Sequence, residues 1–111
     1  SDLGVDTLLS RKVNFTALVA SNDDMAIGAM KQLHEHGVSV PAQVSVIGFD
    51  DIALAAYTIP ALSSVKIPVT EMIQETIGRL IFMLGDGAFT PPKTFTGELI
   101  QRDSVAPPAS R

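Results

Sequence analysis

Apolar positions near the start of the chain first form a continuous run and then recur at helical spacing. Residues 15–20, FTALVA, have the length and character of a strand covered on both faces of a parallel sheet. Asn22 follows with a side-chain oxygen suited to capping a helix, and the acids Asp23 and Asp24 fit its positive first turn. Apolar residues then return every three or four positions until Gly37, a typical stop. The pattern predicts a strand followed by an amphipathic helix.

The alternation of strand and helix patterns continues along the chain. Residues 44–49, VSVIGF, predict a second buried strand that ends at Asp50 and Asp51. Residues 63–67 predict a third strand, and apolar positions within 69–84 trace another amphipathic helix. Strand, helix and strand make a βαβ unit. We therefore expect the α/β class, with a parallel sheet flanked by helices.

Composition limits what the chain can do. Its 111 residues are 46% hydrophobic and 18% charged, the balance of one globular domain or a piece of one. The formal net charge of −4 supplies no basic patch for the phosphates of nucleic acid. The chain has no Cys, so disulfides, thiolate nucleophiles and Cys-bound zinc are excluded. No run is long enough to cross a membrane, and we expect no membrane partner.

Polar residues follow two successive predicted strands. Asn22 comes after the first strand, and Asp50 comes after the second. In open α/β sheets, ligands bind beyond the carboxyl ends of the strands, where a carboxylate and a carboxamide can bond to sugar hydroxyls. Spacing alone leaves a second interpretation open, in which Asn22 only caps a helix and Asp50 only begins a solvated loop.

Enzymatic interpretations find little support in the sequence. Acids after two strands, with Lys66 after a third, suit a phosphoacceptor domain that binds Mg²⁺, but that fold needs five βα units and only three or four strands can be counted. No G-x-S-x-G motif is present, and His34 and His36 are expected on an exposed helix face. We expect no catalytic residue, no metal site and no cofactor.

The first predicted helix and the loop IALAAYTIP carry more apolar residues than one core needs. Ile27 and Met30 lie on the helix, and Tyr57 lies in the loop. Core packing explains part of this surplus, and a surface for self-association is the alternative.

Several ordered motifs resemble the C-terminal part of the LacI/GalR family of sugar-responsive transcriptional repressors. They are A-S-N-D-D-M-A-I-G-A, V-I-G-F-D-D, P-A-L-S-S-V and L-I-x-R-x-S-V, and they span the chain from about residue 6 to residue 105. The resemblance implies a two-lobed, periplasmic-binding-protein-like effector domain behind an N-terminal helix-turn-helix headpiece. It also implies a cytoplasmic, non-enzymatic regulator of a carbohydrate operon.

Under this resemblance, residues 1–111 are a partial effector-binding domain. Residues 1–66 and 93–105 belong to the C-terminal lobe, and 69–84 form the helix after the hinge crossover. The headpiece and most of the N-terminal lobe are absent from this sequence, so operator DNA is bound only through the missing headpiece.

The family match also assigns roles to individual residues. Asn22 and Asp50 match positions that hydrogen-bond the effector, here a sugar or β-glucoside, and the counterparts of Ile27, Met30 and Tyr57 form a homodimer interface. The alternative is one lobe of a periplasmic sugar-binding transport protein, which shares the fold.

Overall fold

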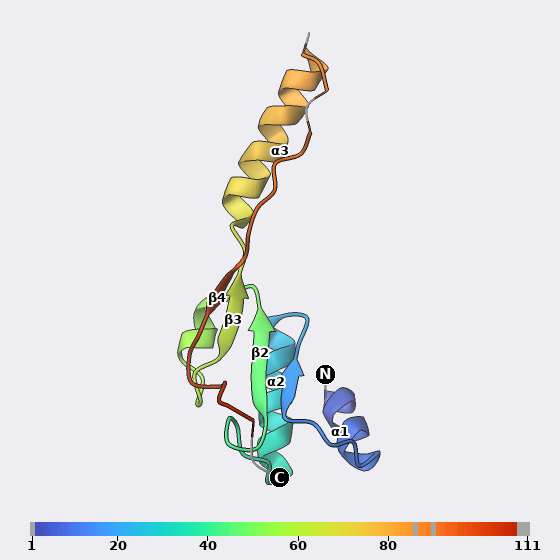
Figure 1. Ribbon diagram of the computed structural model, residues 1–111, viewed down its shortest axis with the longest axis vertical. Helices are drawn as coiled ribbons and strands as arrows, with labels where there is room; N and C mark the ends of the chain where they lie inside the picture. The colour runs from blue at the N-terminus through green and yellow to red at the C-terminus, as the bar shows by residue number, and fades with distance from the viewer. Residues whose placement is uncertain (1, 86, 90, 109–111) are drawn as a thin grey trace. The chain divides into compact units, whose positions relative to one another are not determined.

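Helices and strands alternate along the chain in the computed structural model, which describes residues 2–85, 87–89 and 91–108 (Figure 1). The elements are α1 (Asp2–Ser10), β1 (Ala17–Val19), α2 (Asp23–Glu35), β2 (Ser45–Phe49), the 3-10 helix η1 (Ala53–Ala56), β3 (Ser63–Lys66), α3 (Val69–Leu84) and β4 (Glu98–Ile100). Residues 1, 86, 90 and 109–111 of the predicted 1–111 domain lie outside the described residues.

The chain divides into two compact units. The first contains Ser1–Lys66 and Leu99–Arg111, and the second contains Ile67–Glu98. The first unit therefore holds α1, α2 and the strands β1 to β3, whereas the second holds α3.

A sheet with the strand order β1-β2-β3-β4 lies at the centre of the first unit. β1 pairs in parallel with β2, and β2 pairs in parallel with β3. Val19 lies opposite Ile47, and Phe49 lies opposite Val65, so these three strands end at the same edge. Parallel neighbours need a crossover connection, which α2 provides between β1 and β2. The predicted α/β class, with a parallel sheet and flanking helices, is confirmed.

Helix α2 packs its apolar face against the sheet and against α1. Its first turn is capped by Asn22, whose Oδ1 accepts a hydrogen bond from the backbone N of Met25 at 2.8 Å. The helix ends at Glu35, and Gly37 adopts a φ of 73°, which a residue without Cβ tolerates. The predicted amphipathic helix is confirmed. The core beneath it consists of Val5, Ala20, Ala26, Ala29, Met30, Leu33, Val44, Val46, Ala55 and Leu62.

Successive residues of β2 and β3 face opposite sides of the sheet, as the pleat requires. Gly48 and Ser64 face Asp23 of α2. Ser45 and Ser63 face the C-terminal segment of the chain, with which their hydroxyl groups form hydrogen bonds. The two faces of the sheet are thus covered by different parts of the sequence.

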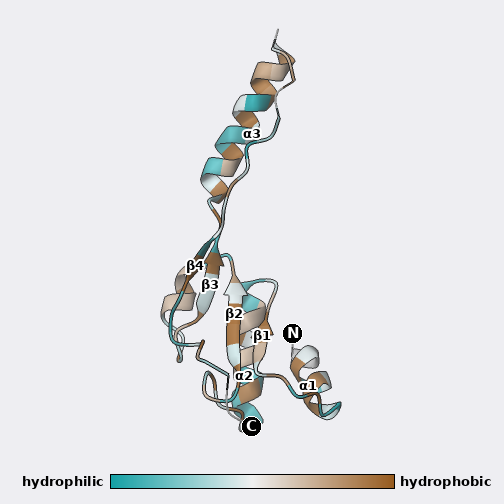
Figure 2. Cartoon of the chain, viewed as in Figure 1, coloured by the Kyte–Doolittle hydropathy of each residue, from teal (hydrophilic) through white to brown (hydrophobic). Residues whose placement is uncertain are grey.

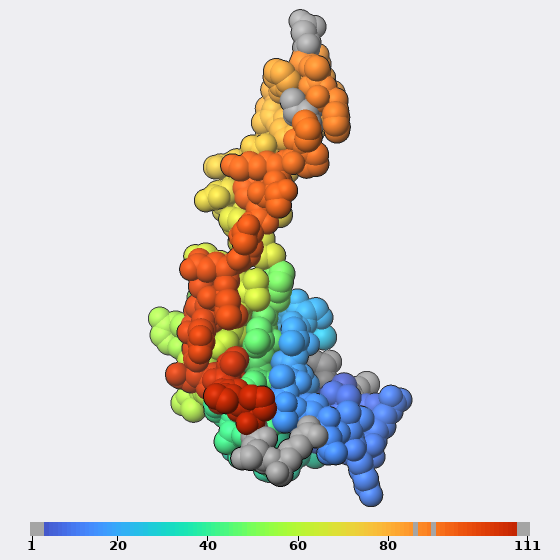
Figure 3. All heavy atoms as spheres, viewed as in Figure 1, coloured from blue at the N-terminus to red at the C-terminus, as the bar shows by residue number. Residues whose placement is uncertain are grey.

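The C-terminal segment, residues 101–106, binds the second face through hydroxyl groups. Ser45 Oγ donates to the backbone O of Ala106 and accepts from its N, both at 3.0 Å. Ser104 Oγ donates to the O of Val46 at 2.6 Å and accepts from the N of Ser63 at 2.9 Å. Figure 3 shows this segment in red on the surface of the first unit. This part of the sheet is therefore contacted by irregular chain rather than by a helix.

The first strand is shorter and more exposed than its sequence predicts. The apolar run over residues 15–20 predicts a strand covered on both faces, but β1 contains only Ala17–Val19. Leu18 packs against the core, whereas the side chain of Val19 is 76% exposed. The prediction of a buried strand is wrong here. Among the described residues, the C-terminal segment contacts β2 and β3 but does not cover the face of β1 that carries Val19.

The second unit is dominated by α3. The helix predicted over 69–84 is observed with the same bounds, Val69–Leu84, and Gly85 is its C-cap. None of its described residues is buried. Figure 2 shows the apolar residues in brown along its length. The exposed large apolar side chains of the helix are Val69, Met72, Ile73, Ile77, Leu80, Ile81, Phe82, Met83 and Leu84.

Candidate functional site

Asn22 stands where the chain passes from β1 into α2. Its backbone is extended, with φ −154° and ψ 171°, and its Oδ1 caps the helix through the N of Met25. Among the described residues, none accepts a hydrogen bond from its Nδ2. Asn22 therefore does what the capping interpretation expects and still holds two amide donors for a ligand.

Asp50 begins the turn that follows β2. Its side chain is exposed, and within the described part of the chain its carboxylate has no hydrogen-bond or ion-pair partner. Asp50 and Asp51 have positive φ values of 105° and 53°, which few non-glycine residues adopt. The backbone N of Asp50 donates to the O of Val65 at 2.9 Å and extends the ladder beyond β2. The carboxylate is thus presented to solvent from an anchored turn.

The strand register brings Asn22 and Asp50 to one edge of the sheet. The pair Val19 and Ile47 is the last recorded between β1 and β2, and the N of Ala20 still donates to the O of Ile47 at 2.9 Å. Asn22 lies three residues beyond the end of β1, and Asp50 is the first residue after β2. Neighbouring strands lie about 4.8 Å apart, so the carboxamide and the carboxylate arise from adjacent backbones. That they bind an effector stays a prediction.

A buried polar cluster lies beneath this edge, and the sequence patterns did not indicate it. Asp23 is 0% exposed, although it was expected only as an acid of the first helical turn. Its Oδ1 accepts from Ser64 Oγ at 2.6 Å, and its Oδ2 accepts from the N of Ile52 at 2.8 Å. Ser64 Oγ in turn accepts from the N of Asp51 at 3.0 Å. The cluster joins α2 and β3 to the turn after β2.

The side chain of Asp51 is half-buried and paired with a cation rather than free in a solvated loop. Its Oδ1 lies 2.8 Å from Nη1 of Arg102, an ion pair whose angles fall outside hydrogen-bond geometry. Nη1 of Arg102 also donates to the O of Leu62, and the backbone N of Arg102 donates to Ser63 Oγ, both at 2.8 Å. The only sequence signal for this arrangement is the position of Arg102 within the motif L-I-x-R-x-S-V.

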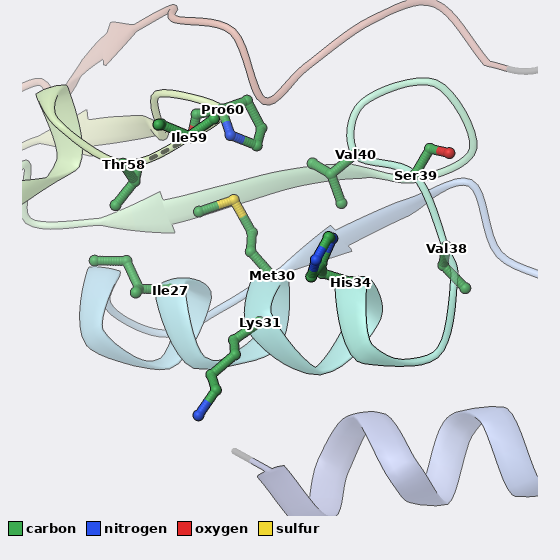
Figure 4. A pocket seen from close by; sticks show the side chains of 10 residues that line it. All are labelled: Ile27, Met30, Lys31, His34, Val38, Ser39, Val40, Thr58, Ile59 and Pro60. Atoms are coloured by element: carbon green, nitrogen blue, oxygen red, sulfur yellow. Dashed lines mark hydrogen bonds between the residues drawn. The ribbon is translucent and has the colours of Figure 1, made fainter.

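The residues predicted for a dimer interface lie at or beside one groove. A groove of about 590 Å³ runs between α2 and the loops after α2 and η1 (Figure 4). Ile27 and Met30 line it, but Met30 is only 8% exposed and packs mainly in the core. Tyr57 is 79% exposed and Ile59 is 98% exposed, so the loop offers most of the apolar surface. The residues lining the groove are Ile27, Met30, Lys31, His34, Val38, Ser39, Val40, Thr58, Ile59 and Pro60.

Comparisons with known proteins agree with this architecture. Residues 3–105 match the model of the periplasmic binding protein-like domain. The sequence is 76% identical over 106 residues to the HTH-type transcriptional regulator AscG of Escherichia coli K12, which covers 96% of this chain and 32% of that protein. It is 33% identical over 104 residues to a lactose operon repressor of Rhizobium radiobacter, and this match covers 94% of this chain and 92% of that protein. The chain belongs to the periplasmic binding protein-like domain family, in its LacI/GalR branch.

Solved structures of LacI/GalR proteins share the fold. The crystal structure of the Escherichia coli repressor AscG superposes with a TM-score of 0.82 at 75% identity, over 95% of this chain and 38% of that one. The lac repressor dimer bound to operator and the anti-inducer ONPF superposes with a TM-score of 0.85 at 28% identity, over 93% and 36%. This LacI/GalR chain thus spans about a third of the length of AscG.

No group of three or more His, Cys, Asp or Glu side chains in the described ranges is arranged to hold a metal ion. His34 lines the groove, while Nε2 of His36 lies 3.3 Å from Oδ1 of Asp6 on α1. No helix in the described part of this LacI/GalR chain has the length and apolar character to cross a bilayer.

Proposed function

We propose that this chain is the effector-binding region of a LacI/GalR transcriptional repressor of a carbohydrate-utilisation operon, acting in the cytoplasm. Its effector is a neutral sugar or glycoside, and it catalyses no reaction. Operator DNA is bound by a headpiece outside this sequence, since the chain's net charge of −4 opposes phosphate contact. The named relatives are transcriptional regulators, which favours this function over the transport alternative.

One observation carries the proposal. The Asp50 carboxylate is exposed, has no described partner and rises from an anchored turn at the carboxyl end of β2, the strand beside β1, which Asn22 follows. A carboxylate accepts from sugar hydroxyls, and the Nδ2 of Asn22 donates to them. A pair of this kind recognises neutral polyols without a nucleophile or a general base.

Calorimetry with the complete gene product tests this proposal. Glucose, galactose, cellobiose and phenyl β-glucoside form the panel, and at least one of them should bind. Asp50→Asn removes the charge while keeping a residue type that tolerates positive φ. The affinity should fall by about 1 to 2 kcal/mol, the difference between hydrogen bonds to charged and to neutral acceptors.

Asp24→Asn is the matched control, because Asp24 is an exposed acid in the first turn of α2, two residues after Asn22. Its affinity should equal that of the wild type. If no sugar of the panel binds, or if Asp50→Asn binds as tightly as the wild type, the proposed site is wrong.

Self-association is the second part of the proposed function. Ile27 and Ile59 line the groove, and the exposed Tyr57 lies two residues before Ile59 in the same loop. An isologous interface uses the same patch on both subunits, so a twofold dimer removes both patches from water at once. The lac repressor relative, a dimer bound to its operator, supports this part of the proposal.

A further inference from the structure

We propose that Asp23 and Ser64 are positioning residues for the sugar site: they hold the turn that presents Asp50, and so set effector affinity without touching the effector. This inference rests on the proposed function, because it gives the buried cluster a role in that same site. Both residues are 0% exposed, so neither contacts a ligand directly.

Three successive backbone amides of the turn have fixed partners. The N of Asp50 donates to the O of Val65 at 2.9 Å. The N of Asp51 donates to Ser64 Oγ at 3.0 Å, and the N of Ile52 donates to Asp23 Oδ2 at 2.8 Å. Two of the three anchors are therefore side chains. These anchors act where φ is positive at Asp50 and Asp51, a conformation that persists only when its surroundings hold it.

The direction of the hydrogen bonds shows that Asp23 orients the Ser64 hydroxyl, which in turn accepts the N–H of Asp51. A hydroxyl has one proton to donate, and the proton of Ser64 goes to Asp23 Oδ1 at 2.6 Å. The lone pairs of Ser64 are left to accept the N–H of Asp51. If an amide replaced the Asp23 carboxylate, one of its two acceptors would become a donor, and either Ser64 or Ile52 would lose its partner.

The sheet itself leaves room for this carboxylate. A Cβ on Gly48, the residue of β2 opposite Ser64, would collide with Asp23 Oδ1. The side chain of Asp23 therefore lies between the backbone of α2 and the sheet. Asp23 directly follows Asn22, which caps the same helix.

Residue-resolved hydrogen exchange on the ligand-free complete gene product tests the anchoring. In Ser64→Ala the amide of Asp51 loses its hydroxyl acceptor and should exchange roughly fivefold faster or more. In Asp23→Asn the amide of Ile52 loses its charged acceptor and should exchange roughly tenfold faster or more. The amide of Asp50 is the internal control, because its acceptor is the backbone of Val65. Asp24→Asn is the matched substitution at an exposed acid and should change none of the three.

A double-mutant cycle separates positioning from a general loss of structure. Asp50→Gly removes the carboxylate and keeps a residue that tolerates the positive φ. Asp23→Asn should weaken binding of the panel's tightest sugar roughly tenfold in the wild-type background and by less than about twofold in the Asp50→Gly background.

Two results would overturn the inference: unchanged protection of Asp51 and Ile52 in both variants, or an equal loss of affinity in the two backgrounds. If no sugar of the panel binds the wild type, the proposed function fails, whereas the exchange measurement still decides whether Asp23 and Ser64 hold the turn.

Discussion

The carboxylate of Asp23 occupies the space that a side chain on Gly48 would need. Gly48 lies in the middle of β2 and is buried, and a Cβ there would also approach Leu62 Cδ2 to 3.1 Å. The glycine is required by this close approach between α2 and the sheet rather than by its backbone angles.

Gly48→Ala should destabilise the protein because the added methyl group forces Asp23 and Leu62 apart. We expect the free energy of unfolding to fall by about 1 to 3 kcal/mol, the usual cost of overpacking. Urea denaturation measures it. Gly4→Ala is the control: Gly4 lies in α1 with nothing within 4 Å of its Cβ position, so alanine there should stabilise by about 0.5 to 1 kcal/mol. A stability of Gly48→Ala equal to the wild type would contradict the observed packing.

Asn22 combines capping with the predicted ligand contact, and two substitutions separate these roles. Asn22→Ala removes both and should cost about 1 kcal/mol of stability, the usual value of an N-cap. Asn22→Asp keeps the oxygen that accepts from Met25 and removes the Nδ2 donors, so stability should be retained while sugar affinity falls. Denaturation and calorimetry on both variants check this. Unchanged affinity in Asn22→Asp would remove Asn22 from the site.

Ile27→Glu should dissociate the proposed dimer, because it places an unpaired charge in an apolar contact. The dimerisation free energy should weaken on the order of 3 kcal/mol. Analytical ultracentrifugation of the complete gene product measures this change. Val13→Glu is the control, since Val13 is an exposed apolar residue outside the groove. A monomeric wild type, or equal dimerisation of Ile27→Glu and Val13→Glu, would contradict the proposed surface.

Ser104→Ala should cost about 1 to 3 kcal/mol of stability because it removes both hydrogen bonds of a fully buried hydroxyl group. The partners of this hydroxyl are the O of Val46 and the N of Ser63. Ser10→Ala removes an exposed hydroxyl bonded to the O of Thr7 and should stay within about 0.5 kcal/mol of the wild type. Chemical denaturation of both variants distinguishes the two cases.

Local signals were enough to predict the elements that local chemistry determines. Helix α2 begins and ends where Asn22 and Gly37 indicate, because capping and a left-handed stop depend on neighbours in the sequence. The bounds of α3 follow equally from its apolar period and from Gly85. Asn22 and Asp50 were assigned to one edge because parallel strands end together.

Long-range chemistry could not be predicted from the same patterns. Asp23 and Asp24 look alike as adjacent acids, yet only Asp23 is buried. The difference arises from Gly48, which leaves space, and from Ser64, a donor 41 positions away in the sequence. The apolar run over residues 15–20 predicts a longer and more buried strand than β1 for a related reason. Apolar side chains indicate that a residue can be buried, but they do not show whether another part of the chain covers it.

During translation, Ser45 and Ser63 are synthesised long before the groups that form hydrogen bonds with their hydroxyls. The Ser45 hydroxyl donates to the O of Ala106, 61 positions later, and the Ser63 hydroxyl accepts from the N–H of Arg102, 39 positions later. Because domains fold as units during synthesis, the first unit completes its sheet only after nearly all of these 111 residues have left the exit tunnel. A nascent chain that stalls within α3 leaves both hydroxyls to water.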